Sequence, residues 1–415
     1  MHNLREELIR RLPAGILELL ELISSKAHHL HVKIYLVGGV VRDILLNRDI
    51  VDIDLVVESN AIEFVRALGL KDTKIVEYKR FGTVKLKRIG SEIDIATARS
   101  EYYPSPGSLP EVKFGSLKED LFRRDFTINA MAISLNPDNY GDFYDPFHGF
   151  DDLNKRLIRV LHDKSFIDDA TRMWRAIRYE QRLGFSLETG TLNILKSSLD
   201  YLGCISGDRI RHEMELVLRE DLPEKIFQRA GQLGILCKLN PGLMADEWLS
   251  LKFGELRNCD CRVDNLIPSY LCLLFYRLKF NDLTALLDYL HFSKVIREAI
   301  VQTHILKGKL GYLEQEGLQP GEIYLFLKGY PQVTVISNMI AVDSEQIKER
   351  IRAYLSSYKN IKISLNGDDL TRFGVKNKVE IKRILENILK ERLNGNIKSK
   401  EDEVLYVHKL LQDQK

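Results

Sequence analysis

The hydrophobic and polar positions divide the chain into a mixed front part and a helical remainder. Between residues 33 and 142, apolar and polar residues alternate over short runs, a period of two that is typical of β-strands. Beyond residue 153 the apolar positions recur at helical spacing, punctuated by Gly, Pro and Asn. The pattern predicts an α/β head followed by an all-α region. The expected strands are Lys33 to Val37, Asp52 to Val57, Thr83 to Lys87 and Glu92 to Thr97.

Two further patterns lie near the chain ends. Residues Leu4 to Ile23 have helical spacing interrupted by Pro13, which predicts a broken helix packed onto the head. Residues from Ile361 onward are dense in Lys and Arg around Gly374. Such a segment either faces the phosphates of a nucleic acid or is a solvated helix face. We divide the chain into a head (1–142), a helical neck (143–220), a helical body (221–345) and a helical tail (346–415).

Length and composition fit several ordinary globular domains. A chain of 415 residues is too long for one core, and its 45% hydrophobic and 29% charged residues lie near the average of soluble proteins. The net charge is only +2, so affinity for nucleic acid has to come from local basic patches. No apolar run is long enough to span a bilayer, which predicts no membrane partner. The five cysteines are an odd number in a chain without a secretory leader, which predicts reduced thiols and a cytoplasmic location.

A glycine pair follows the first predicted strand. Tyr35-Leu36-Val37 has the composition of a buried strand and runs directly into Gly38 and Gly39, after which a helix begins. A tight glycine turn lets backbone N–H groups approach a phosphate, and Arg42 in the helix adds positive charge. Because Gly-Gly after a strand is also common in plain turns, the pattern predicts a phosphate site only together with further residues.

Three aspartates lie on the strands that follow. Period-two alternation places Asp52 and Asp54 on one face of a strand and Ile53 on the other, and Asp94 alternates with isoleucines in the same way. Neighbouring carboxylates repel each other unless cations neutralise them, and their hard oxygen atoms suit Mg²⁺. The three aspartates therefore predict a catalytic site for two Mg²⁺ ions, which would activate a hydroxyl and neutralise a leaving pyrophosphate. An Asp-x-Asp pair by itself also occurs in sugar-nucleotide enzymes.

These residues carry a resemblance to a known family. Gly38 to Asp43, followed by Asp52-Ile53-Asp54, resembles the first motif of the polymerase-β-type nucleotidyltransferases, and more specifically of the class II tRNA nucleotidyltransferases. That family includes CCA-adding, A-adding and CC-adding enzymes and bacterial poly(A) polymerases. The resemblance implies a polymerase-β-like α/β nucleotidyltransferase head, followed by an all-α neck, body and tail.

Two more segments extend the resemblance. Arg123 to Ala130 is similar to the family's second motif, which implies contacts with the ribose and triphosphate of the incoming nucleotide. Arg124 has the fork geometry for phosphate oxygens, and Asp125 would accept a hydrogen bond from a ribose hydroxyl. Asp145 to Leu153 resembles the third motif, a joint between head and neck. The first two motifs together imply a nucleotide-binding set of Gly38, Gly39, Arg42, Arg124, Asp125 and Asn129.

Asp168 to Tyr179 resembles the fourth motif, whose side chains select the base in relatives. Asp169 and Arg172 are three residues apart, so we expect an acceptor beside a donor on one helix face. Cytosine and adenine present the complementary pattern, whereas uracil and guanine would leave polar groups unpaired. The resemblance extends the nucleotide contacts to Arg175 and Arg178, for which an amphipathic helix face is the alternative.

The remaining features bear on the choice of substrate. Residues 98 to 113 are rich in Pro and Gly and are expected to form a mobile loop, which in relatives helps to change specificity from C to A. Ser206 to Glu213 resembles a fifth motif that supports the base-selecting helix. Together the motifs predict an enzyme that adds CCA, or its terminal A, to the acceptor end of tRNA from CTP and ATP. The alternatives are a poly(A) polymerase acting on RNA 3′ ends and a catalytically inactive RNA-binding relative.

Overall fold

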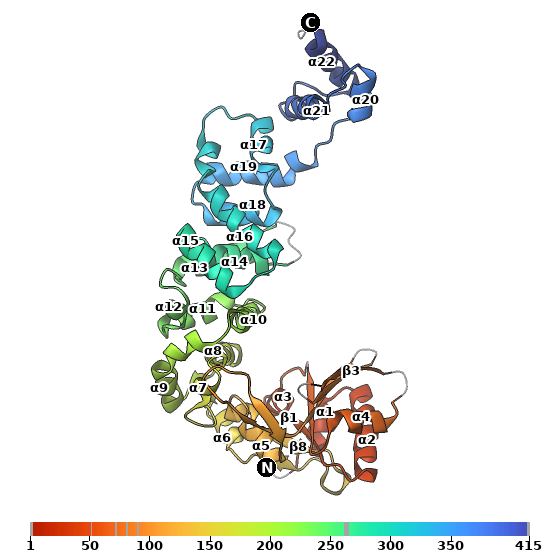
Figure 1. The fold of residues 1–415 in the computed structure, drawn as a ribbon, viewed down its shortest axis with the longest axis vertical. Coiled ribbons are helices and arrows are strands. Elements are labelled where there is room, and N and C mark those ends of the chain that lie inside the picture. Colours follow the sequence, from red (N-terminus) through yellow and green to blue (C-terminus); the bar gives the residue numbers. More distant parts are fainter. Residues whose placement is uncertain are drawn as a thin grey trace. The chain divides into compact units, whose positions relative to one another are not determined.

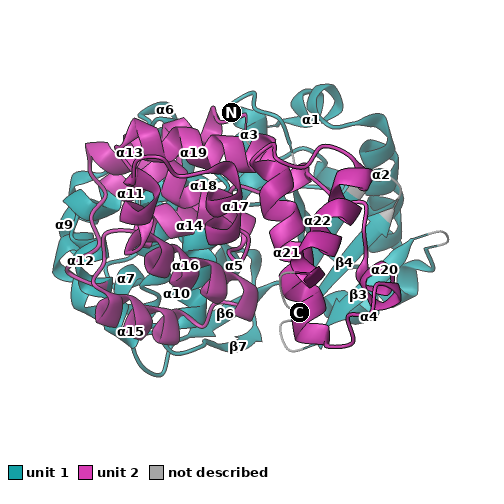
Figure 2. Cartoon of the chain, turned by 90° about the horizontal axis from the view of Figure 1, so that it is seen from above, with its two compact units in different colours: residues 1–220, 229–239 teal, residues 221–228, 240–415 magenta. Residues whose placement is uncertain are grey.

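A computed structural model describes residues 3–50, 52–70, 73–79, 82–88, 91–260 and 265–412. The chain forms two compact units, coloured separately in Figure 2. Unit 1 comprises residues 1–220 and 229–239, and unit 2 comprises residues 221–228 and 240–415. The first boundary falls at the predicted end of the neck, so unit 1 contains the predicted head and neck. The four-part division of the chain stays a prediction.

Unit 1 is built around a mixed sheet (Figure 1). Its strands are β1 (Ile34–Val37), β2 (Ile53–Val57), β3 (Lys74–Tyr78), β4 (Thr83–Arg88), β5 (Ser91–Thr97), β8 (Ala132–Ser134) and β9 (Phe143–Tyr144). The order across the sheet is β3-β4-β5-β2-β1-β8-β9, and β2 and β5 run parallel while the other neighbours are antiparallel. The four predicted strands are confirmed as β1, β2, β4 and β5, except that Asp52 lies just before β2.

The two faces of this sheet are covered by different apolar clusters. Because side chains alternate along a strand, Leu36 and Leu55 point into a large core, whereas Val37 and Val56 point into a smaller cluster on the opposite face. The large core also takes side chains from α1 (Arg5–Arg11), α2 (Ala14–His29), α3 (Gly39–Leu45) and α4 (Ala61–Leu68), and the smaller one from α5 (Leu117–Phe122). Pro13 separates α1 from α2, so the predicted helix break is confirmed.

Residues 98 to 113 form a hairpin and not the expected loop. Strand β6 (Arg99–Tyr102) pairs with β7 (Glu111–Phe114) in an antiparallel two-stranded sheet. Only the segment between these strands, residues 103–110, is the turn that the prolines and Gly107 predict. The loop prediction is therefore wrong for the flanks, where a ladder of backbone hydrogen bonds orders the segment.

The rest of unit 1 is helical, apart from a short parallel pair of β10 (Leu157–Ile158) and β11 (Ser186–Leu187). Trp174 and Phe166 are fully buried in this part of the unit. Its helices are α6 (Gly149–Asn154), α7 (Ser165–Asp168), α8 (Thr171–Leu183), α9 (Thr189–Ser197), α10 (Gly207–Val217) and α12 (Ile235–Leu239), and α11 (Pro223–Gln232) crosses the unit boundary.

Unit 2 contains only helices among its described residues, as predicted. They are α13 (Glu247–Arg257), α14 (Ile267–Phe275), α15 (Phe280–Leu290), α16 (Lys294–Lys307), α17 (Pro320–Leu327), α18 (Gln332–Ala341), α19 (Glu345–Ser356), α20 (Gly367–Arg372), α21 (Lys378–Leu393) and α22 (Lys400–Gln412). The last three enclose a separate apolar cluster around Leu370, Ile388 and Val407. The segment around Gly374 therefore has a core of its own.

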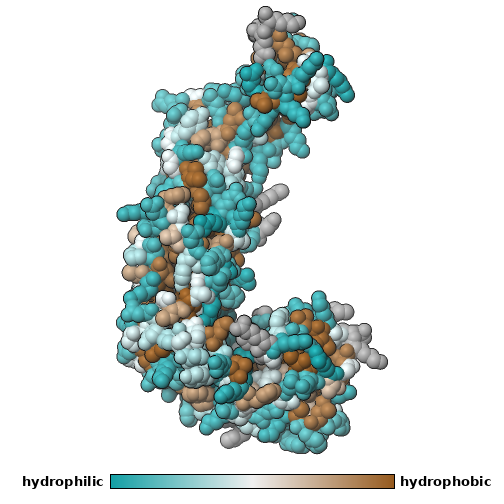
Figure 3. All heavy atoms as spheres, in the orientation of Figure 1, coloured by the Kyte–Doolittle hydropathy of each residue, from teal (hydrophilic) through white to brown (hydrophobic). Residues whose placement is uncertain are grey.

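The remaining features of the fold concern its surface and its cysteines. Hydrophilic residues cover most of the face seen in Figure 3, with apolar patches scattered among them. Among the described residues, no helix has the length and apolar content needed to cross a membrane. Cys204, Cys237 and Cys272 are free thiols, as predicted. Cys259 is disulfide-bonded, so the prediction is wrong at that position, and Cys261 lies outside the described residues.

Candidate active site

Asp54 and Asp94 are direct neighbours on one face of the sheet. The parallel register aligns them across β2 and β5, and both point to the face of Val56, opposite the large core. Asp52 precedes Asp54 by two residues and is exposed. Burial raises the pKa of the Asp54 carboxyl above its ordinary value, Arg124 opposes this rise, and the charges of Asp94 and Asp52 add to it. Asp52 and Asp94 therefore both lie close enough to Asp54 to act on its carboxyl.

The glycine turn lies against the same carboxylates. Gly38 has a φ of +82° and directly precedes α3. A Cβ atom at this position would lie 2.6 Å from Nη1 of Arg124 and 3.7 Å from Oδ2 of Asp54. Because both the left-handed backbone and the close approach favour glycine, Gly38 allows the turn, the guanidinium and the carboxylate to come together.

The carboxylates supply part of a ligand set for a hard cation. Oδ1 of Asp94 is buried and has no hydrogen-bond partner, whereas Oδ2 lies 3.2 Å from Nζ of Lys85. Within the part of the chain that the structure describes, no three His, Cys, Asp or Glu side chains form a group able to hold a metal ion. Mg²⁺ typically takes one or two carboxylates and completes its shell with water and substrate phosphates. The donor set therefore fits Mg²⁺ that arrives together with a triphosphate.

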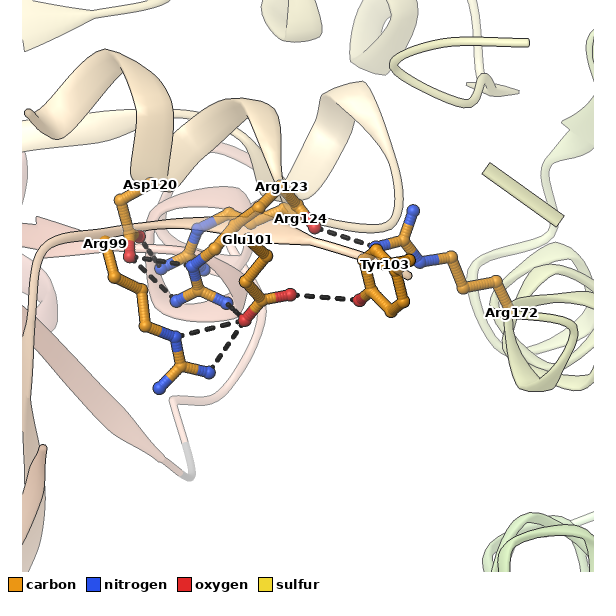
Figure 4. Close-up of polar contacts among 7 residues, drawn as sticks. All are labelled: Arg99, Glu101, Tyr103, Asp120, Arg123, Arg124 and Arg172. Atoms are coloured by element: carbon orange, nitrogen blue, oxygen red, sulfur yellow. Dashed lines mark hydrogen bonds and ion pairs between the residues drawn. The ribbon is translucent and has the colours of Figure 1, made fainter. Parts of the chain in front are cut away.

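Arg124 is held in place by a buried acid that sequence reasoning missed. Asp120 in α5 is completely buried and accepts hydrogen bonds from Arg123 at 2.7 and 2.9 Å and from Arg124 at 3.1 Å (Figure 4). Burial by itself raises the pKa of Asp120, but the two guanidinium groups outweigh it and lower the pKa below its ordinary value. The available signal in the sequence was an acidic residue three and four positions before two arginines, a spacing that brings side chains together across a helical turn.

Asp125 is the centre of a buried polar network. Its Oδ1 accepts from Nδ2 of Asn129 at 2.9 Å, and its Oδ2 accepts from Arg175 at 2.6 and 2.8 Å. Arg42, which is also buried, donates to Oδ1 of Asn129 at 2.7 Å. Burial raises the pKa of Asp125, but Arg175 and the hydrogen bonds hold it at about 2. The carboxylate is thus ionised and already occupied, and its contact with a ribose hydroxyl stays a prediction.

The two predicted base-selecting residues lie on the neck side of the site, in a different arrangement from the expected one. Asp169 has an extended backbone and precedes α8, so it is not on the helix face of Arg172. Its Oδ1 accepts from the backbone and hydroxyl of Thr171 and pairs with Arg209 at 2.7 Å. Arg172 donates to Ser165 and to the carbonyl oxygen of Arg123, each at 2.8 Å. The carboxylate acceptor of Asp169 and the guanidinium donor of Arg172 are therefore held in place by different residues.

Arg175 and Arg178 differ in their position. Arg175 lines the pocket and carries the ion pair with Asp125, whereas Arg178 is buried and lies 3.6 Å from Glu213 and 3.7 Å from Glu220. Arg178 is not among the residues that line the pocket. A nucleotide contact by Arg178 therefore stays a prediction, and its observed partners are those of a structural ion pair.

Most of these groups line one pocket of about 730 Å³ within unit 1. Among the predicted residues, it is lined by Gly39, Arg42, Asp52, Asp54, Arg124, Asp125, Asn129, Asp169, Arg172 and Arg175. Gly38 and Asp94 lie directly behind this lining, against Asp54. A volume of this size is in the range of small-molecule sites. The pocket lining thus combines the carboxylates of Asp52 and Asp54 with the carboxylate of Asp169 and the guanidinium of Arg172.

Comparison with known proteins places the chain in a family. Residues 34–159 match the model of the poly A polymerase head domain, and residues 184–247 match that of the probable RNA and SrmB- binding site of polymerase A. A solved CCA-adding enzyme in an apo form has a TM-score of 0.84 and 33% identity, with 98% of each chain covered. The chain belongs to the tRNA nucleotidyltransferase and poly(A) polymerase family.

Members of this nucleotidyltransferase family resemble the chain over most of its length. The Thermotoga maritima CCA-adding enzyme, solved in complex with tRNA, has a TM-score of 0.80 and 31% identity over 99% of this chain and 98% of its own. The A-adding tRNA nucleotidyltransferases of Geobacter sulfurreducens and Aquifex aeolicus are 32% and 35% identical over 95% and 88% of this chain. The alignments cover 47% and 45% of those proteins, so the chain spans about half the length of these curated relatives. Nucleotidyltransferases of this type are typically metal-dependent.

The hairpin adds pocket residues that the sequence did not reveal. Glu101 and Tyr103 both line the pocket, and the hydroxyl of Tyr103 donates to Glu101 at 2.9 Å (Figure 4). Burial raises the pKa of Tyr103, so the phenol stays protonated. At the hairpin tip, a Cβ on Gly107 would lie 2.6 Å from the carbonyl oxygen of Cys204, which shows how closely the tip packs on the neck. The sequence did not reveal these contacts because no periodic pattern connects the hairpin with the neck.

Proposed function

We propose that the chain is a template-independent RNA nucleotidyltransferase that adds CCA, or its terminal A, to tRNA 3′ ends from CTP and ATP. The observation that carries this proposal is the pairing of Asp54 with Asp94 beside Gly38, at a pocket that is also lined by Asp169 and Arg172. The paired carboxylates suit a triphosphate with its metal ions, and Asp169 with Arg172 suits a base. The proposed compartment is the cytoplasm: the free thiols of Cys204, Cys237 and Cys272 support it, whereas the disulfide-bonded Cys259 does not.

The reaction would join the RNA 3′-oxygen to the α-phosphorus of the nucleotide and break the bond from that phosphorus to the β-phosphate. Two Mg²⁺ ions, held by Asp52, Asp54 and Asp94 together with the triphosphate, would activate the 3′-hydroxyl and neutralise the leaving pyrophosphate. Arg124, positioned by Asp120, would donate to phosphate oxygens.

The network around Asp125 would orient the nucleotide. Asn129 and Arg175 fix the carboxylate from two sides, so the wall of the pocket at this point is rigid before the nucleotide binds. Preorganised groups of this kind reduce the entropy cost of binding and increase the fraction of correctly aligned complexes. Asn129 also connects this wall to Arg42 in the helix after the glycine turn.

Base choice would follow from Asp169 and Arg172. Cytosine and adenine each offer an exocyclic amine next to an unprotonated ring nitrogen, which complement a carboxylate acceptor and a guanidinium donor. Uracil and guanine offer a carbonyl next to an N–H and would leave both protein groups unpaired. Their partners, Arg209 for Asp169 and Ser165 for Arg172, would hold the two side chains in fixed orientations.

One experiment tests this proposal and separates it from its alternatives. A tRNA transcript is prepared in three forms, ending before the first C, after one C, and after both, and each is incubated with labelled CTP or ATP. Extension of all three supports a CCA-adding enzyme, and extension only of the last supports an A-adding one. Long A tails indicate a poly(A) polymerase instead. RNA binding without any incorporation indicates the inactive RNA-binding relative and contradicts the proposal.

A further inference from the structure

A lysine is aligned with the carboxylate cluster in the sheet. Strand β4 lies beside β5 in antiparallel register, and Lys85 faces Asp94 directly. Asp94 in turn faces Asp54 across β5 and β2. Residues aligned across neighbouring strands project to the same face. Lys85, Asp94 and Asp54 therefore form a row over three strands, and Nζ of Lys85 lies 3.2 Å from Oδ2 of Asp94.

The row has a positive group at each end. At the Asp54 end, Arg124 and Asp54 both lie against the position that a Cβ of Gly38 would take, and at the other end Lys85 contacts Asp94. Between them are the carboxylates of Asp54 and Asp94, with Asp52 adjoining. Two neighbouring anions in a partly buried position require such counter-charges when no other cation is present.

The two oxygens of Asp94 have different surroundings. Oδ2 is engaged by Lys85, whereas the buried Oδ1 has no hydrogen-bond partner. A buried carboxylate oxygen without a partner is costly and calls for a ligand. Lys85 also contacts Glu92 at 3.3 Å, and Lys87 contacts Glu92 at 2.5 Å, so the lysine nearer the active site is the one that reaches Asp94.

We infer that Lys85 is a positioning residue that serves as a built-in counter-cation of the active site: it holds Oδ2 of Asp94 and leaves Oδ1 for a divalent ion. The inference rests on the proposed function, since it assumes that these aspartates receive Mg²⁺. Lys85 stabilises the carboxylate row while the metal is absent, and its charge opposes the metal when it binds. The site thereby remains folded without metal and releases the ion more readily.

This role has a measurable consequence that needs neither nucleotide nor RNA. In Lys85→Met, which keeps an unbranched side chain one atom shorter and removes its charge, the melting temperature in EDTA should fall because the carboxylates lose a counter-charge. The apparent affinity for Mg²⁺, measured by titration calorimetry and by the rise in melting temperature, should increase several-fold, up to about tenfold. Lys85→Arg keeps the charge and should behave like the parent in both measurements.

Lys87→Met is the matched control, because Lys87 lies on the same strand and pairs with Glu92 but not with Asp94. Equal Mg²⁺ affinities in Lys85→Met and Lys87→Met would overturn the inference. If Lys85→Met folds only when millimolar Mg²⁺ is present, the inference is supported, since the ion then replaces the lysine. Failure to fold with and without Mg²⁺ would overturn it. A parent protein that binds Mg²⁺ but incorporates no nucleotide would refute the proposed function alone.

Discussion

Arg209 and Asp169 form an ion pair of 2.7 Å between α10 and the residue that follows α7. The other terminal nitrogen of Arg209 donates to the carbonyl oxygen of Gly107 at 3.1 Å, at the tip of the β6–β7 hairpin. One guanidinium group therefore joins the hairpin to the carboxylate that is predicted to read the base. The orientation of that carboxylate depends on a segment about sixty residues away in sequence.

Replacing Arg209 by Ala is expected to weaken discrimination between bases more than it lowers overall transfer. Asp169 would lose a charged partner, and a hydrogen bond to a charged group contributes enough to change the ratio of kcat/KM for ATP over UTP by about tenfold. Arg211→Ala, on the same helix and paired with Asp208 and Glu215, is the control. An unchanged ratio in Arg209→Ala would show that the ion pair has no part in base choice.

Gly38→Ala is expected to reduce transfer strongly while leaving the fold intact. The new Cβ would meet the Arg124 guanidinium and would require an unfavourable backbone, so Arg124 has to move away from the phosphate position. Gly69→Ala is the matched control, because Gly69 also has a positive φ, of +60°, but has open space around it. The measurement is kcat/KM for ATP beside the melting temperature. Equal losses of activity in both variants would contradict the close approach at Gly38.

The ion pair between Asp125 and Arg175 is expected to make the free energy of unfolding depend on pH. The folded pKa of Asp125, about 2, lies below that of an unfolded aspartate, so this stabilisation is complete above about pH 5 and is lost as the pH falls toward 2. Urea unfolding of the parent and of Asp125→Asn should therefore differ most near neutral pH, and the difference should shrink by about 2 kcal/mol in acid. Asp138→Asn, at a site whose side chain is 85% exposed, should show no such change. A difference that is independent of pH would argue against the pair.

Local patterns predicted the parts of the active site that lie within single strands. Alternation in Glu92 to Thr97 placed Asp94 on the face opposite the isoleucines, and that placement is confirmed by the core that Ile93 and Ile95 join. The register that sets Asp94 beside Asp54 could not be predicted from the sequence, because it depends on pairing between strands about forty residues apart.

Contacts between segments that are far apart in the sequence explain the remaining differences between the structure and the predictions. Lys85 and Arg209 each reach their aspartate across neighbouring elements, so no spacing in the sequence reveals them. Residues 98 to 113 contain prolines and a glycine that favour a turn, but backbone pairing extends order on both sides of it. Asp169 was expected on a helix face because its spacing to Arg172 fits a helix. In the structure α8 begins two residues after Asp169, at Thr171, and the Asp169 side chain accepts hydrogen bonds from that first helical residue.

The most direct measurement follows the two ends of the triphosphate separately. A tRNA ending in CC is incubated with Mg²⁺ and ATP labelled at either the α- or the γ-phosphate, with the parent and with Asp54→Asn. If the carboxylates at Asp54 and Asp94 support nucleotidyl transfer, the α-label enters the RNA, the γ-label appears in pyrophosphate, and Asp54→Asn loses at least about a hundredfold in rate. Failure of the parent to transfer the α-label to any tRNA end, or equal transfer by Asp54→Asn, would contradict it.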